Sequence, residues 1–90
     1  MDHKCVMQGL AIVVLDRGFV YVGNVTVEDE WCRIENAKNI RYWGTKAGLG
    51  ELVGGPTKDT KLDNVGSVSA PLRAVIHIID VDKKAWASVI

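Results

Sequence analysis

Two short apolar runs separated by a turn signal constrain the fold of this chain most strongly. The runs Leu10–Leu15 and Phe19–Val27 are rich in β-branched residues, which favour extended strands. Asp16-Arg17-Gly18 between them is typical of a turn, so the two runs are predicted to form a β-hairpin. Gly23, inside the second run, indicates a bulge or bend that would let a small sheet curl.

Further strand patterns follow along the chain. Trp31–Glu35 alternates apolar with large or charged residues, as a half-buried strand does, which also places Cys32 in the core. Ile40–Trp43 is predicted as a short fourth strand, after a turn at Asn36–Asn39. The continuous apolar run Leu72–Ile79 is typical of a strand covered on both faces, by this chain or by another subunit. Because the connections are short, the first strands are expected to pair in sequence order, as a meander.

Between the fourth and fifth predicted strands the pattern changes twice. Apolar spacing over Leu49–Val53 predicts one short helix, and the Gly-Gly-Pro sequence after it is a strong stop. Pro56–Ser69 is polar and rich in turn residues, and is predicted as a long loop of a functional or mobile kind. The predicted fold class is mainly β, a small α+β protein. We expect an antiparallel meander or small curled barrel of about five strands, with one short helix after the fourth.

Length and composition exclude several classes of protein. Ninety residues fit a single domain, 1–90, with a modest core that oligomerisation would extend, so a homo-oligomer is expected. The 48% apolar content is too high for a disordered chain. The longest apolar run, Leu10–Leu15, is far shorter than the roughly 20 residues of a membrane helix. The N-terminal residues lack the pattern of a secretion signal, so no membrane partner and a cytoplasmic location are expected.

The sequence carries no recognisable catalytic or metal-binding pattern. Gly48–Gly54 differs from a dinucleotide-binding fingerprint, because its third glycine comes one position late and no second βαβ half follows. His3 and Cys5 are close in sequence, but Cys32 and His77 are remote from them, so the four residues fit no zinc motif. His77 lies in an apolar strand pattern, so we expect a core or interface histidine. The chain is therefore predicted to be no enzyme and to use no metal or cofactor.

Charge is balanced overall but uneven along the chain. Residues 1–36 carry six acids and three bases, whereas residues 37–61 carry five bases and two acids. The basic excess falls on residues 39–55, which also hold five glycines and an aromatic pair, and on the loop that follows them. Because the net charge is zero, no overall field attracts nucleic acid, and nucleic acid is not an expected partner.

This basic and aromatic stretch is the candidate ligand site. In a strand Ile40–Trp43, Arg41 and Trp43 share one face, and an aromatic ring beside an arginine can stack a nucleotide base. Thr45 and Lys46 would add a hydroxyl and a charge at the start of the short helix, where free amides attract phosphate. The alternative is a core tryptophan, a helix-capping threonine and glycines that serve only turns. With cations and a hydroxyl from the following loop, the predicted ligand-binding residues are Arg41, Trp43, Thr45, Lys46, Lys58, Thr60 and Lys61.

The same stretch carries a family resemblance. The sequence IENAKNIRYWGTKAGLGEL, followed by a turn-rich loop and AVIHIID, resembles small domain-of-unknown-function proteins of bacteriophages and prophages, with the motifs N-A-x-x-I-x-x-W and L-x-E-L. The resemblance covers most of residues 12–80. It implies a phage setting and brings no catalytic residues. The matching positions are Asn36, Ala37, Ile40, Trp43, Leu49, Glu51 and Leu52.

The resemblance and the candidate site together give the expected function. Small, compact and oligomeric phage proteins include several that sequester nucleotide immune signals of the host, an analogy of size and context. We therefore expect a non-catalytic phage protein that binds and sequesters a nucleotide-derived host immune signal in the host cytoplasm. The alternative is a protein-interaction or structural phage module without a small-molecule ligand. A single-stranded nucleic-acid binder is a third and weaker hypothesis.

Overall fold

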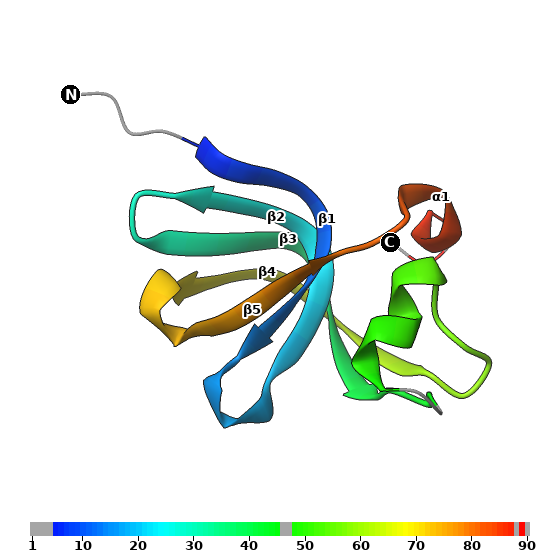
Figure 1. The fold of residues 1–90 in the computed structure, drawn as a ribbon. Coiled ribbons are helices and arrows are strands. Elements are labelled where there is room, and N and C mark those ends of the chain that lie inside the picture. Colours follow the sequence, from blue (N-terminus) through cyan, green and yellow to red (C-terminus); the bar gives the residue numbers. More distant parts are fainter. Residues whose placement is uncertain (1–4, 46–47, 88, 90) are drawn as a thin grey trace.

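The computed structural model describes residues 5–45, 48–87 and 89. Within them, five strands form one open antiparallel sheet in the order β4-β3-β2-β1-β5 (Figure 1). The strands are β1 (Cys5–Leu15), β2 (Val20–Glu28), β3 (Trp31–Tyr42), β4 (Lys61–Pro71) and β5 (Val75–Asp80). Shorter elements join or follow them: the 3-10 helices η1 (Asp16–Gly18), η2 (Leu49–Gly54) and η3 (Leu72–Ala74), and the α-helix α1 (Lys83–Trp86).

The predicted fold class is confirmed. Strands β1 to β4 pair in sequence order as a meander, and β5 returns to pair with the free side of β1. The two edge strands, β4 and β5, both pack side chains against one apolar cluster, so the sheet curls around that cluster. The sheet has no hydrogen-bonded pairing between β4 and β5, which leaves it an open, curled sheet.

Both faces of the sheet are used for burial, because successive residues of a strand point to opposite faces. In β1, Val13 belongs to a cluster inside the curl, and its neighbour Ile12 belongs to a cluster on the outside. We call these the inner and the outer cluster. The buried members of the inner cluster are Ala11, Val13, Leu15, Val25, Val27, Cys32, Ile34, Ala37 and Ala70. Those of the outer cluster are Leu10, Ile12, Val20, Val22, Ile40, Leu52 and Trp86.

The outer cluster is covered by η2 and α1, which lie side by side against the sheet (Figure 1). Trp86 is fully buried, and its indole Nε1 donates a hydrogen bond to the Leu52 carbonyl oxygen at 2.9 Å. The amide of Asp82 likewise donates to the Val53 carbonyl oxygen at 2.9 Å. A tryptophan near the C-terminus thus serves the core of its own chain.

Two predicted strands are in fact one. The segments Trp31–Glu35 and Ile40–Trp43 were expected to flank a turn at Asn36–Asn39, but β3 runs continuously to Tyr42. The polar residues form a bulge instead: Asn36 has φ 52°, and the register with β4 shifts between Ile34 and Ala37. A bulge uses turn-forming residues without ending the strand, so the local sequence does not distinguish the two. The predicted short helix therefore follows the third strand, and it is a 3-10 helix.

The prediction of a long loop at Pro56–Ser69 is also wrong. Only residues 56–60 connect η2 to the next strand, and β4 begins at Lys61. Most of the first seven residues of β4 are exposed, so the strand shows no alternation of apolar and polar residues. The segment is a strand because its backbone pairs with β3, although its own composition does not favour a strand.

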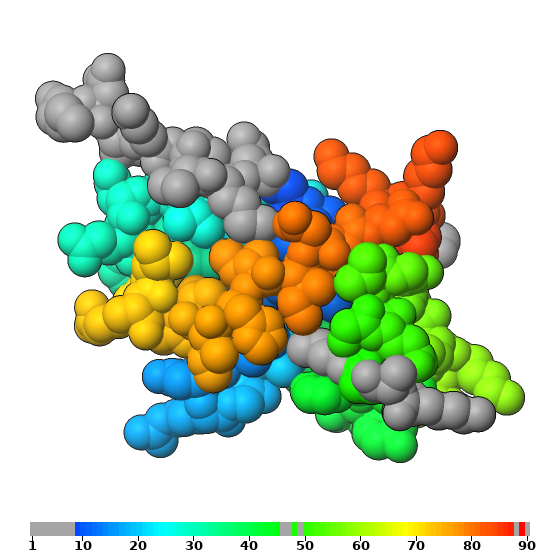
Figure 2. Space-filling model, in the orientation of Figure 1, coloured from blue at the N-terminus to red at the C-terminus, as the bar shows by residue number. Residues whose placement is uncertain are grey.

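Strand β5 differs from its prediction in burial. The run Leu72–Ile79 was expected to be covered on both faces, but its first three residues form η3 and the rest is an edge strand. Ile76 is 61% exposed and His77 is also exposed. His77 is therefore not a core residue of its own chain, which leaves the expectation of an interface histidine. Figure 2 shows atoms of β5, in orange, at the surface of the molecule.

We expect Gly18→Ala to destabilise the protein by about 1 kcal/mol or more, because φ at Gly18 is +81° in the β1–β2 turn. No atom lies near the added Cβ, so the cost is conformational rather than steric. Chemical denaturation gives the difference in unfolding free energy. Gly50→Ala is the matched control, since Gly50 also has open space around it and lacks a positive φ. Equal stability of the two variants would contradict the turn.

Candidate functional site

The end of β3 presents two adjacent aromatic side chains. Simple alternation places Ile40 and Tyr42 on one face, but the register with β4 shifts between them, so Arg41 is an extra residue. Ile40 is consequently buried, whereas Tyr42 is 59% exposed and Trp43 is 40% exposed. Trp43 is therefore not the core anchor of the alternative interpretation, and both rings are available at the surface.

A shallow open depression lies at this end of the strand. It has a volume of about 320 Å³ and is lined by Arg41, Tyr42, Trp43, Gly44 and Thr45. Three predicted site residues therefore line one surface, together with Tyr42, which the sequence argument did not select. We call this surface, with the neighbouring residues 57–61, the aromatic site.

A tight turn fixes the backbone beneath the aromatic site. The hydroxyl of Thr60 donates to the Trp43 carbonyl oxygen at 2.7 Å, and the hydroxyl of Thr57 donates to the Gly44 carbonyl oxygen at 2.8 Å. The Thr57 amide donates to the Thr60 hydroxyl at 2.8 Å, which closes the turn on itself. The loop that supplies predicted site residues is thus held in place, and the hydroxyl proton of Thr60 is used within the protein.

Gly44 is the residue that allows this turn to approach. Its φ is +67°, a conformation that favours glycine. A Cβ at this position would lie 2.5 Å from the carbonyl carbon of Asp59 and 2.7 Å from the amide nitrogen of Thr60. Any side chain at position 44 would therefore push the turn away from β3.

The cations of the site come from two segments. Arg41 Nε lies 2.9 Å from Asp63 Oδ2, and both side chains are about half exposed, so solvent screens this ion pair. Lys61 is opposite Tyr42 in the β3–β4 register, and Lys58 is exposed at the tip of the turn. The register thus places Lys61 beside Tyr42, whereas Lys58 does not line the depression. Lys46, also predicted for the site, lies outside the described residues.

The helix start does not have the predicted arrangement. The residue that precedes η2 is Gly48, and no side chain caps the helix there, so Thr45 is not its cap. Because η2 is a 3-10 helix of six residues, we assign no anion site to its amides. Any phosphate bound here would depend on the cationic side chains.

The described part of the chain shows neither an activated cysteine nor a group of metal ligands. Cys32 is buried, and this burial raises the pKa of its thiol, which disfavours the nucleophilic thiolate. Among the residues described, no three His, Cys, Asp or Glu side chains are grouped as metal ligands would be. Across the same residues, no helix is both long and apolar enough for a membrane span.

Sequence reasoning missed the supporting residues of the site. Tyr42 was assigned to the opposite face, because a bulge cannot be read from alternation. Thr57 and Gly44 were treated as loop and turn residues, although a Thr-x-x-Thr spacing after a glycine-rich segment is a signal for a hydroxyl-stabilised turn. Trp31, 56% exposed on another part of the sheet, was read only as part of a strand.

No known protein-family model matches the chain, and comparisons with curated proteins and with solved structures find no similar protein. The phage-family resemblance therefore stays a prediction. The argument for function rests on the geometry of the described residues.

We expect Gly44→Ala to destabilise the protein by about 2 kcal/mol or more, since it combines a positive φ with a backbone clash. Thermal and urea unfolding measure the loss. The control is Gly54→Ala, where the added Cβ meets no atom within 4 Å. If Gly44→Ala were as stable as the control, the packing of the Thr57–Thr60 turn against β3 would be wrong.

Proposed function

We propose that this protein is a non-catalytic binding protein that holds an anionic, nucleotide-derived ligand at the aromatic site. In the phage setting that the sequence resemblance implies, the bound molecule is a host immune signal, and binding removes it from its receptor. The proposal needs no chemical step, because sequestration depends only on affinity and on a slow release.

The observation that carries the proposal is the pair of exposed aromatic rings, Tyr42 and Trp43, at a depression whose backbone is fixed by the Thr57–Thr60 turn. Single exposed apolar side chains are ordinary, but two adjacent exposed rings make a contiguous apolar patch, which is more typical of a binding surface. Stacking of one base on such a ring contributes about 1–3 kcal/mol. A site that is already ordered loses little conformational entropy when the ligand binds.

The charges around the site favour an anion only modestly. Arg41, Lys58 and Lys61 supply three positive charges, and Asp59 and Asp63 supply two negative charges, so these five residues give a net charge of +1. Asp63 also competes with a ligand phosphate for Arg41. This arrangement suits a ligand with few phosphates, such as an ADP-ribose derivative or a cyclic oligonucleotide, better than a nucleic-acid strand.

A second candidate function, a protein-interaction module, is favoured by the edge strand β5. Between Val75 and Ile79 the strand has no lysine, proline or acidic residue, and Ile76 is widely exposed. Natural edge strands are usually protected by such residues, because their unpaired backbone groups pair readily with another strand. The other edge, β4, does carry charges and ends at Pro71.

A second copy of the chain is a fitting partner for β5. Antiparallel pairing of two β5 strands would bring Arg73 near the start of one strand close to the end of the other, where Asp80 lies. Parallel pairing would instead align like charges. A homo-oligomer through β5 is compatible with the aromatic site, since the two features involve different strands.

For ligand binding, thermal shift against a panel of signalling nucleotides should identify a ligand, since one present at 100 times its Kd adds about 2.7 kcal/mol of stability. With that ligand, we expect Lys61→Ala to weaken binding by about 1–3 kcal/mol through loss of a charge-assisted hydrogen bond. Asp63→Asn should strengthen binding by up to about 1 kcal/mol, because it frees Arg41. Titration calorimetry measures both changes.

The control for these charge changes is Lys84→Ala, which removes an exposed cation from α1, outside the aromatic site. Trp43→Ala should abolish binding without large loss of stability, and the ligand should be recovered intact after denaturation. A ligand that binds equally well to Lys61→Ala and Trp43→Ala would refute the site. No stabilisation by any nucleotide would favour the interaction module.

For self-association, we expect the protein to be an oligomer at micromolar concentration and Ile76→Lys to make it monomeric, because a lysine protects an edge strand from pairing. Light scattering coupled to size exclusion gives the mass of each species. Val65→Lys is the control, as it changes an exposed apolar residue of β4, the other edge strand of the sheet. A monomeric wild-type protein would contradict the β5 interface.

A further inference from the structure

The outer face of β2 and β3 is only partly covered. The cross-strand pairs Asn24–Glu35, Thr26–Arg33 and Glu28–Trp31 follow one another along this face. The residues between them, such as Val25 and Ile34, point into the inner cluster. The polar pairs and Trp31 therefore share one side of the sheet, beyond the part that η2 and α1 cover.

Two depressions on this face lie next to each other. One, of about 540 Å³, lies between β2, the Asn36 bulge of β3 and Lys83 of α1. The other, of about 410 Å³, is lined by Trp31 and its neighbours. Thr26 lines both, so the two depressions adjoin each other, and we call them together the outer groove. Each volume lies within the range of small-molecule sites in proteins.

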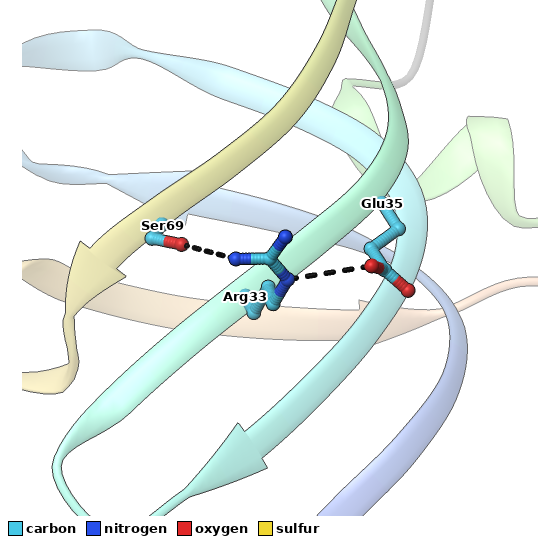
Figure 3. A network of polar contacts seen from close by, with 3 residues as sticks. All are labelled: Arg33, Glu35 and Ser69. Atoms are coloured by element: carbon cyan, nitrogen blue, oxygen red, sulfur yellow. Dashed lines mark hydrogen bonds and ion pairs between the residues drawn. The ribbon is translucent and has the colours of Figure 1, made fainter.

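Arg33 lines the depression beside Trp31 and makes two polar contacts there. Its Nη1 donates to Ser69 Oγ at 3.2 Å, and its Nε donates to Glu35 Oε2 at 3.3 Å (Figure 3). Figure 3 shows the guanidinium held between β4 on one side and Glu35 on the other. These contacts favour an orientation of the arginine along the face, and solvent screens the ion pair because both side chains are more than half exposed.

The lining of the groove is charge-balanced. It contains two carboxylates, Glu28 and Glu35, and two cations, Arg33 and Lys83, so its net charge is zero. A polyanion would meet the carboxylates, and a polycation would meet the arginine and lysine. The charge balance therefore favours a neutral ligand, in contrast to the basic aromatic site.

The uncharged side chains of the groove indicate the kind of neutral ligand. Asn24, Asn36, Thr26 and Ser69 each combine donor and acceptor capacity, which matches ligand hydroxyl groups. Trp31 is 56% exposed at one end and offers an apolar ring face. A peptide fits less well, because the groove lies on the face of the sheet, where strand backbone groups are already paired, and Trp31 is its one large apolar lining residue.

We propose that the outer groove binds a neutral, polyhydroxylated chain, that is, an oligosaccharide, with a sugar ring on Trp31 and hydroxyl groups on the Arg33 network and the asparagine amides. This binding is independent of the nucleotide ligand. It uses a different tryptophan and a different face of the sheet from the aromatic site.

The test is titration calorimetry of the full chain with linear hexasaccharides of glucose, mannose and N-acetylglucosamine at millimolar concentration. We expect at least one to bind, with an affinity that rising salt barely changes, since ionic screening does not act on a neutral ligand. Trp31→Ala should lower that affinity by about tenfold or more. The matched control Trp43→Ala should stay within about twofold of wild type.

A second measurement does not depend on removing Trp31. In a Trp43→Phe variant the remaining tryptophans are Trp31 and the buried Trp86, so quenching by acrylamide reports chiefly on Trp31. The bound oligosaccharide should reduce this quenching. Absence of binding by all three hexasaccharides, unchanged affinity in Trp31→Ala, or unchanged quenching would each overturn the proposal. Binding of a peptide instead, with the same dependence on Trp31, would overturn the ligand class.

Discussion

The close crossing of β2 and β3 at Gly23 is the constraint on which the rest of the structure depends. A Cβ on Gly23 would lie 2.8 Å from the Glu35 carbonyl oxygen and 2.8 Å from a methyl carbon of Ile34. Because glycine leaves this space free, β3 can bulge at Asn36 directly opposite. The extra residue turns Ile40 to the outer cluster while Ile34 and Ala37 both remain in the inner one.

That change of face determines where the surfaces available for binding lie. Beyond the bulge, the outer face is apolar and is covered by η2 and α1, which are joined through Trp86. Before the bulge, the same face is polar and uncovered, and forms the outer groove. A second bulge, at Arg41, exposes Tyr42 at the end of β3 and so creates the aromatic site. Both proposed sites thus follow from irregularities in one strand.

The two sites differ in chemistry, and this difference is the reason that different ligands are proposed for them. The aromatic site combines two rings with a small positive charge, and its backbone is fixed by threonine hydroxyls. The outer groove is neutral and rich in groups that both donate and accept hydrogen bonds. Strand β5 adds a third surface, an unprotected edge suited to pairing with a second copy. A small chain can carry all three because its core occupies both faces of a single curled sheet.

The sequence by itself determined the β character, the first hairpin and the burial of Cys32, because each depends on local propensity or on alternation. It also located the region of the aromatic site from its clustered bases, rings and glycines. Only the tertiary structure decided that Asn36 continues a strand, that Lys61 begins another, and that Tyr42 is exposed. In each case pairing with a neighbouring strand overrides the local pattern, since backbone hydrogen bonds across the sheet stabilise segments whose own residues favour turns.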